Sequence, residues 1–309
     1  MLSRFAREKR VPGWFVMSVD ADTVHFAQGR FERSAKSPIS AYGSERLADK
    51  QGLPKLANSM RLSRYACAAL LRPGEYQLLL VDAPSVPREE LKSAIRWKIK
   101  DMIDYHVDDA TVDVLDIPPP EGAAGRNHMM FAVSANNEVL QQKIRQFEQA
   151  HIALSVIDIP ETAQRNIASL YETGDRALGL VHLGEESGLL TINFRSELYL
   201  ARRLEIGFQQ FADGSGGREI ALEHLAVEVQ RTLDHFDRQF RSVPVTRMLV
   251  APSPASGVAE ALKARLGIDA QEIDLNDMLA FVGEAPDKEA QWRLFHHFGA
   301  TLRNETKVL

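Results

Sequence analysis

Residues 15–27, FVMSVDADTVHFA, predict how the first half of the chain folds. The apolar and β-branched residues on either side of Asp20-Ala21-Asp22 are typical of two strands joined by a tight turn. Residues 178–194, LGLVHLGEESGLLTINF, repeat this arrangement. Each pair begins the same order of strand meander, helix, strand, helix and strand. We therefore expect an α/β protein with two related lobes and a ligand cleft at the turns between them.

Three further segments bear on the fold. Residues 76–81 form a short apolar run that predicts a buried strand, whereas residues 43–60 are polar and indicate a helix or loop. Pro160 is well placed to begin a helix that runs to Tyr171. Glu161 and Arg165 lie four residues apart in that helix, and we interpret them as an exposed surface pair.

The composition excludes several classes of protein. The 309 residues are 45% hydrophobic, enough for a substantial core, and the net charge of -5 disfavours a nucleic-acid partner. No apolar run approaches the ~18–20 residues that span a bilayer. The basic residues 1–15 lack the apolar centre of a signal peptide, so we expect a solvated tail or at most peripheral membrane contact. Cys67, the only cysteine, excludes an internal disulfide.

Four segments carry a resemblance to a known family. They are YQLLLVDAPSVP at residues 76–87, AIRWKIKDMIDY at 94–105, IDIPETAQRN at 157–166 and EVQRTLD at 228–234. Together they resemble the MshI family of proteins that assemble the mannose-sensitive haemagglutinin (MSHA) type IV pilus. That family is similar to PilM, the actin-like protein of the type IV pilus inner-membrane platform.

The resemblance implies the two-lobed fold of the actin, Hsp70 and sugar-kinase superfamily. It places the first lobe at residues 14–175, with an inserted subdomain at about 84–134, and the second lobe at 176–275. Residues 276–309 would then form a C-terminal helical tail. It also implies a cytoplasmic scaffold, peripheral to the inner membrane, that binds the short tail of a membrane protein. Self-association stays open as a further kind of contact.

The first turn departs from what an actin-like ATPase needs. PilM-like proteins carry a motif resembling Ile-Asp-Ile-Gly-Ser-Ser-Ser-Val-Lys, and alignment on Val24 puts Ser18 at the Asp position and Asp20 at the Gly position. His25 takes the place of the Lys. Asp20 and Asp22 would face a polyphosphate. Like charges ~4 Å apart repel by about 1 kcal/mol in water, so we expect this turn to oppose ATP.

The second and third loops depart as well. In Val181-His182-Leu183-Gly184, Gly184 is kept but His182 replaces the Mg²⁺-directing Asp. The adenine loop has Pro252 and Ser253 instead of a glycine pair. We therefore expect degenerate nucleotide loops, no catalytic residues and no cofactor. Two alternatives stay open: an ATP- and Mg²⁺-binding PilM-like protein, and a sugar- or acetate-kinase-like enzyme.

The remaining candidates concern metals and partners. His296-His297 lacks companions at metal-ligand spacing, so we expect a partly exposed pair and no metal site. The resemblance places a partner's tail beside the inserted subdomain, where Trp97, Ile103 and Tyr105 are candidate anchors. The alternative is that these three residues belong to the core.

Overall fold

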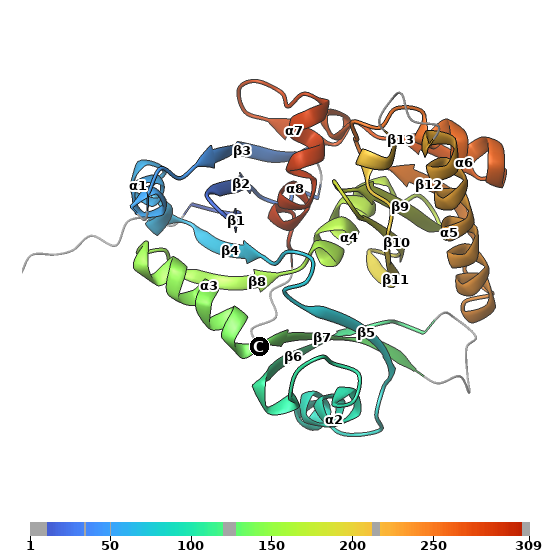
Figure 1. Cartoon of the computed structure of the whole chain (residues 1–309), viewed down its shortest axis with the longest axis horizontal. Helices are drawn as coiled ribbons and strands as arrows, with labels where there is room; N and C mark the ends of the chain where they lie inside the picture. The colour runs from blue at the N-terminus through green and yellow to red at the C-terminus, as the bar shows by residue number, and fades with distance from the viewer. Residues whose placement is uncertain (1–10, 34, 50, 120–127, 212–216, 305–309) are drawn as a thin grey trace, which may run out of the picture.

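A computed structural model describes residues 11–33, 35–49, 51–119, 128–211 and 217–304. These residues form three β-sheets with helices packed around them (Figure 1). Most of the basic N-terminal segment lies outside the described residues.

The first lobe contains a six-stranded sheet in the order β14-β3-β2-β1-β4-β8. Its strands are β1 (Trp14–Asp20), β2 (Thr23–Gly29), β3 (Ser37–Arg46), β4 (Ala66–Leu70), β8 (Leu154–Asp158) and β14 (Leu279–Phe281). The second lobe contains the order β11-β10-β9-β12-β13. Its strands are β9 (Ala177–Leu183), β10 (Gly188–Phe194), β11 (Glu197–Leu204), β12 (Val245–Val250) and β13 (Asp269–Glu272).

The two sheets share one topology. In each, three antiparallel strands form a meander whose first strand pairs in parallel with the next strand along the chain. A further parallel strand completes each set of five. Both predicted hairpins are present: β1 pairs with β2 from Trp14 to Gly29, and β9 pairs with β10 from Leu178 to Asn193. The duplication inferred from the two turns is therefore a property of the sheets.

Eight α-helices surround these sheets in the part of the chain described. They are α1 (Gly52–Ser59), α2 (Leu91–Ile99), α3 (Asn137–Gln149), α4 (Pro160–Tyr171), α5 (Gly217–Gln239), α6 (Val258–Leu266), α7 (Lys288–Arg293) and α8 (Phe295–Thr301). Helix α4 begins and ends where the sequence predicts. It lies between the two lobes, which explains why every residue from Pro160 to Ala168 is buried.

The third sheet is small and has the order β5-β7-β6, with strands β5 (Gln77–Asp82), β6 (Ala110–Asp116) and β7 (Met129–Asn136). Together with α2 it forms the inserted subdomain at the bottom of Figure 1. Its sheet starts at Gln77, upstream of the expected boundary at residue 84. The strand expected at 76–81 is confirmed, but its burial is only partial, because β5 is an edge strand and Leu80 is 37% exposed.

The C-terminal residues are integrated into the first lobe rather than appended as a helical tail. Strand β14 pairs with β3, and α8 packs on β1, β2 and α4. The approach of α8 to α4 requires glycine at Gly299, since a Cβ there would lie 2.1 Å from the carbonyl oxygen of Ala163. A helix from the middle of the chain and one from its C-terminal part thus meet at the junction between the lobes.

Candidate functional site: the cleft between the two hairpin turns

The structure brings the first two predicted loops to one cavity. This cavity of about 670 Å³ is bordered by Asp20 from the β1–β2 turn and by residues 184–188 from the β9–β10 turn. Arg72 and Arg203 line it from other directions. The third predicted loop does not reach the cavity lining: Ser253 is 1% exposed, and its Oγ accepts a hydrogen bond from the backbone N–H of Ala255 at 3.1 Å. Pro252 is also buried.

The side chain of Ser18, at the position expected to direct a metal, makes a hydrogen bond within the protein. It is 8% exposed, and its Oγ lies 2.8 Å from Nε2 of His297 on α8. Burial lowers the pKa of His297 to about 3, so this imidazole is neutral at physiological pH. The expectation of a partly exposed His296-His297 pair was wrong for His297, which is 6% exposed.

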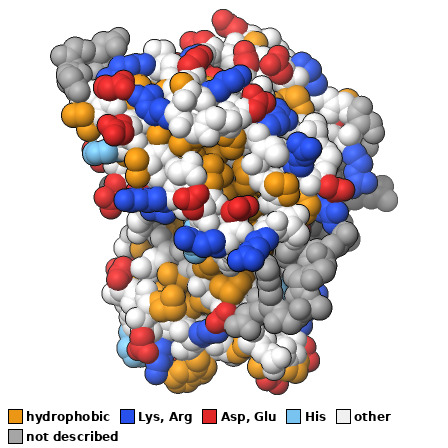
Figure 2. Space-filling view, turned by 90° about the vertical axis from the view of Figure 1, so that its right-hand side faces the viewer, with side chains coloured by type: hydrophobic (Ala, Val, Ile, Leu, Met, Phe, Trp, Pro, Cys, Tyr) orange, Lys and Arg blue, Asp and Glu red, His pale blue; other side chains and the backbone are white. Residues whose placement is uncertain are grey.

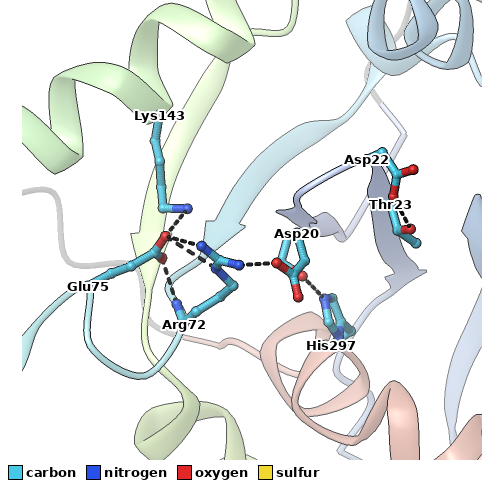
Figure 3. A network of polar contacts seen from close by, with 8 residues as sticks. Asp20, Asp22, Thr23, Arg72, Glu75, Lys143 and His297 are labelled. Atoms are coloured by element: carbon cyan, nitrogen blue, oxygen red, sulfur yellow. Dashed lines mark hydrogen bonds and ion pairs between the residues drawn. The ribbon is translucent and has the colours of Figure 1, made fainter. Parts of the chain in front are cut away.

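The carboxylate of Asp20 is paired with a guanidinium. Arg72 donates from Nη1 to Oδ1 of Asp20, and its Nη2 lies 3.3 Å from Oε1 of Glu75. Lys143 on α3 approaches the same Glu75 oxygen at 2.9 Å, which completes the chain of charges in Figure 3. Asp22 is paired with Arg46 and is not part of the cavity lining. Of the two carboxylates expected to repel a polyphosphate, Asp22 therefore lies outside the cavity lining, and the charge of Asp20 is offset by Arg72.

The second turn is filled by aromatic groups from the C-terminal helices. Nε2 of His182 lies 3.2 Å from the carbonyl oxygen of Trp292, and its ring stacks on Phe295 with centroids 5.0 Å apart. Burial lowers the pKa of His182 to about 4, opposed by the hydrogen bond with Trp292. The indole N–H of Trp292 donates to the carbonyl of Leu183 at 2.7 Å. His182 is therefore a neutral, packed side chain.

The turn that follows His182 is also held by the backbone. Gly184 donates its N–H to the carbonyl of Ser187 at 2.9 Å, and its own carbonyl accepts from the N–H of Phe208 at 2.8 Å. Gly207 lets these segments approach, because a Cβ there would lie 2.1 Å from the carbonyl oxygen of Glu185. The two acidic residues Glu185 and Glu186 line the cavity at the place where phosphates would approach.

These features do not fit a Mg²⁺-bound nucleotide. Magnesium prefers carboxylate and water oxygens, but the two positions expected to supply carboxylates hold a serine bonded to His297 and a neutral histidine. The described residues contain no group of three or more His, Cys, Asp or Glu placed to hold a metal ion. Of the features expected of a nucleotide site, the structure has two hairpin turns at one cavity and one glycine, Gly184.

A second polar cluster, beside this cavity, joins the two lobes and the inserted subdomain. It contains Glu161, which the sequence analysis wrongly assigned to an exposed surface pair with Arg165. Glu161 is 1% exposed rather than a surface residue. Its Oε2 accepts from the hydroxyl of Tyr76, and its Oε1 accepts from Nη2 of Arg203 at 3.1 Å. Burial raises the pKa of Glu161, opposed by Arg203 and by the Tyr76 hydroxyl. Arg165 is buried too, and hydrogen-bonds Asn166.

The cluster connects three parts of the molecule. Tyr76 leads into the inserted subdomain, Glu161 lies in the first turn of α4, and Arg203 belongs to β11 of the second lobe. Gln164, one turn further along α4, donates from Nε2 to the carbonyl of Leu180 at 2.8 Å. No local pattern in the sequence signals these contacts, because their members lie 42 and 85 residues apart from Glu161.

The three predicted partner anchors do not form one surface. Trp97 on α2 is 70% exposed, and Lys100 lies 5.9 Å from the centre of its ring. Ile103 instead packs with Ile95 and Ile99 in the core of the inserted subdomain. The hydroxyl of Tyr105 donates to Oγ of Ser134 at 2.9 Å. Of the three, Trp97 alone has the exposure that a partner contact needs.

Comparison with known proteins defines the fold. No protein-family model and no curated protein matches the sequence. Among solved structures, the PilM–PilN type IV pilus biogenesis complex aligns with a TM-score of 0.68 and 17% identity over 94% of this chain and 97% of the other. The cytoplasmic domain of EpsL, an inner-membrane component of the Vibrio cholerae type II secretion system, aligns with a TM-score of 0.50 and 10% identity over 91% and 92%.

A Bacteroides thetaiotaomicron protein with an actin-like ATPase fold aligns with a TM-score of 0.50 and 9% identity over 91% of this chain and 96% of the other. Within the described residues, no helix has the length and apolar character needed to cross a bilayer. The shared strand order, the two facing hairpin turns and these alignments lead to one conclusion. The chain has the actin-like ATPase fold, as expected from the sequence.

Proposed function

We propose that this protein is a non-hydrolysing, actin-like scaffold on the cytoplasmic side of the inner-membrane platform of a type IV pilus, of the MSHA type. In this role it binds a short tail of an inner-membrane pilus assembly protein. The similarity to PilM, whose solved structure is a complex with PilN, supports the class of partner. The quoted sequence segments support the MSHA type.

The main support for a scaffold role is that polar side chains at the cleft bind other groups of the protein. Three positions that would serve Mg²⁺ and phosphates are instead committed to internal contacts: Ser18 to His297, Asp20 to Arg72, and His182 to Trp292. A nucleotide would have to break these contacts and would meet Glu185 and Glu186. A protein whose Ser18, Asp20 and His182 are engaged in internal contacts would retain the actin-like architecture as a frame for partners.

Trp97 supplies the proposed partner contact on the inserted subdomain. Exposed tryptophans are rare on monomer surfaces and enriched at binding hot spots, where truncation costs ~2 kcal/mol or more of binding energy. Its exposure of 70% means that Trp97→Ala removes little packing from the fold. Loss of binding by this variant can therefore be separated from loss of stability.

Capture of inner-membrane proteins tests the proposal. Immobilised wild-type protein is mixed with detergent-solubilised inner membranes, and retained pilus assembly proteins are identified by mass spectrometry. Trp97→Ala should lose them, whereas Val282→Ala, a control at an apolar side chain that is 66% exposed in the first lobe, should retain them. Equal retention by both variants would remove Trp97 from the site, and no retained pilus protein with wild type would contradict the function.

The alternative is a genuine ATP-binding protein of the same class. The size of the cavity, about 670 Å³, and the retained Gly184 favour it. Saturable binding of ATP that depends on Mg²⁺ would select this alternative over the scaffold that we propose.

A further inference from the structure

A polar cavity lies at the end of the second sheet that is remote from the cleft between the hairpin turns. It measures about 440 Å³, a volume that suits a small molecule. The first residues of β9, Ala177 and Leu178, line this cavity, whereas His182 lines the cleft near the other end of the same strand. The strand spans about 20 Å, so the cavity is separate from the cleft.

Most side chains around this cavity are polar and come from three places. These are the loop between α4 and β9, the start of β12 and the start of β13, which meet because the three strands run parallel. In that order they contribute Glu172, Thr173 and Arg176; Thr246 and Arg247; and Asp269.

An irregularity in β12 turns two consecutive side chains toward the cavity. Successive residues of a regular strand point to opposite faces. The pairing of β12 with β9 skips Thr246, because Val245 lies opposite Ala177 whereas Arg247 lies opposite Leu178, the next residue. A bulge of this kind re-aims side chains and is common beside active sites. It explains how Thr246 and Arg247 both line one space.

Neither arginine of the lining is neutralised by a carboxylate. Nη1 of Arg247 donates to the carbonyl oxygen of Tyr171 at 3.3 Å, which leaves most of its five N–H groups available. Arg176 is exposed and has no hydrogen bond or ion pair to any residue that the structure describes. The carboxylate next to it in the chain, Asp175, is paired with Arg195 at 3.0 Å.

The two carboxylates of the lining, in contrast, have donors of their own. Oε2 of Glu172 accepts from the backbone N–H of Ser196 at 2.7 Å, and burial raises the pKa of this carboxyl group. Oδ1 of Asp269 lies 3.7 Å from Nζ of Lys263. The charge that is left to attract a ligand is therefore the positive charge of the guanidinium groups.

We propose that this cavity binds a small organic phosphate with a single phosphate group. The guanidinium groups and the hydroxyls of Thr173 and Thr246 offer more donors than the two oxygens of a carboxylate need, whereas a phosphate monoester presents three oxygens. The rest of the lining is polar, and Glu172 and Asp269 can accept hydrogen bonds from the hydroxyls of a sugar. The same carboxylates would repel the additional phosphates of ATP.

A local site, and not the overall charge, has to hold this anion. The net charge of -5 disfavours anions at long range. Figure 2 shows acidic and basic side chains side by side over the face of the molecule that it draws. Binding should therefore depend on the arginines of the lining and not on an arginine elsewhere.

Calorimetric titration of the full chain with ribose 5-phosphate tests the proposal. We expect saturable binding, no saturable heat with ribose, and at least tenfold weaker binding of inorganic phosphate. Arg176→Ala and Arg247→Lys should each weaken ribose 5-phosphate by about tenfold or more, because a phosphate loses a guanidinium or its planar fork. Arg241→Ala, a control at an exposed arginine outside the lining, should bind as wild type does.

Hydrogen exchange locates the ligand. Exchange at residues 172–178 should slow when ribose 5-phosphate is bound, and protection confined to the turns at 20–23 and 184–188 would place the ligand in the cleft and overturn the proposal. Absence of saturable binding, equal affinity for inorganic phosphate, or equal binding by the lining variants and Arg241→Ala would overturn it as well. The site is independent of the scaffold role, so these results leave the capture of pilus proteins unaffected.

Discussion

Two adjacent arginines on β11 offer a direct test of the cluster that joins the subdomains. Arg202 and Arg203 have nearly equal side-chain exposure, 40% and 39%. Their carboxylate partners differ: the Glu228 side chain is 25% exposed, whereas that of Glu161 is 2% exposed. We expect Arg203→Ala to be much more destabilising than Arg202→Ala, because it leaves a buried carboxylate without its cation.

The magnitude follows from the burial of the partner. Removing one member of a buried ion pair costs roughly 3–5 kcal/mol, and because Arg203 is itself partly exposed, water can reach the vacated space. We therefore expect Arg203→Ala to lower the free energy of unfolding by about 2–3 kcal/mol. Arg202→Ala should lower it by no more than about 1 kcal/mol, as is usual for exposed pairs.

Urea unfolding at pH 7, followed by tryptophan fluorescence, measures both values. The loss for Arg203→Ala should shrink as the pH is lowered toward 5, since the folded-state pKa of Glu161 is raised and its protonation removes the buried charge. Adding Glu161→Gln to Arg203→Ala should recover part of the stability. If the two arginine variants were equally stable, or the double variant were less stable than Arg203→Ala, the reasoning would be refuted.

Four further outcomes follow from the structure. In the folded state the pKa values of His182 and His297 are lowered to about 4 and about 3, so the free energy of unfolding is highest above pH 6.5 and falls as the pH is lowered. At pH 5 each histidine should lower the free energy of unfolding, measured in urea, by about 2 kcal/mol. A His182→Leu variant that is as acid-sensitive as wild type would contradict this. Burial raises the pKa of Cys67 to about 11, so Ellman's reagent should label it only at the rate of unfolding. Trp97→Ala should change stability by less than about 0.5 kcal/mol, and a larger loss would indicate a core role. Ile103→Ala should cost about 2 kcal/mol, because its side chain packs in the inserted subdomain, and wild-type stability would argue against that packing.

The sequence predicts the fold well where local signals and topology agree. The helix from Pro160 to Tyr171 was predicted from its proline start, and both ends are confirmed. Strand β3, Ser37–Arg46, was not predicted, and residues from Gly43 onward were expected to be helix or loop, because the polar residues lie at a half-exposed part of the sheet and give no alternating pattern. The strand forms because it continues the meander from β2, which is a tertiary cause.

The candidate site was predicted in part, for a similar reason. The two turns were placed correctly at one cleft, since the fold brings duplicated hairpins together. The partners of their side chains were not foreseen: Ser18 and His297 lie 279 residues apart. Two charged residues four positions apart, such as Glu161 and Arg165, form a surface pair only if that side of the helix faces solvent. Helix α4 lies between two lobes and has none over its first turns.

The central claim is that the side chains expected to serve Mg²⁺ and phosphates are engaged in internal contacts, so that the cleft does not serve as an ATPase site. Calorimetric titration of the full chain with Mg²⁺-ATP, with phosphate release followed in the same samples, tests it most directly. We expect no saturable heat and no phosphate above a boiled control. Micromolar binding would show that the contacts of Ser18, Asp20 and His182 open to admit a nucleotide, and phosphate release in addition would contradict the claim entirely.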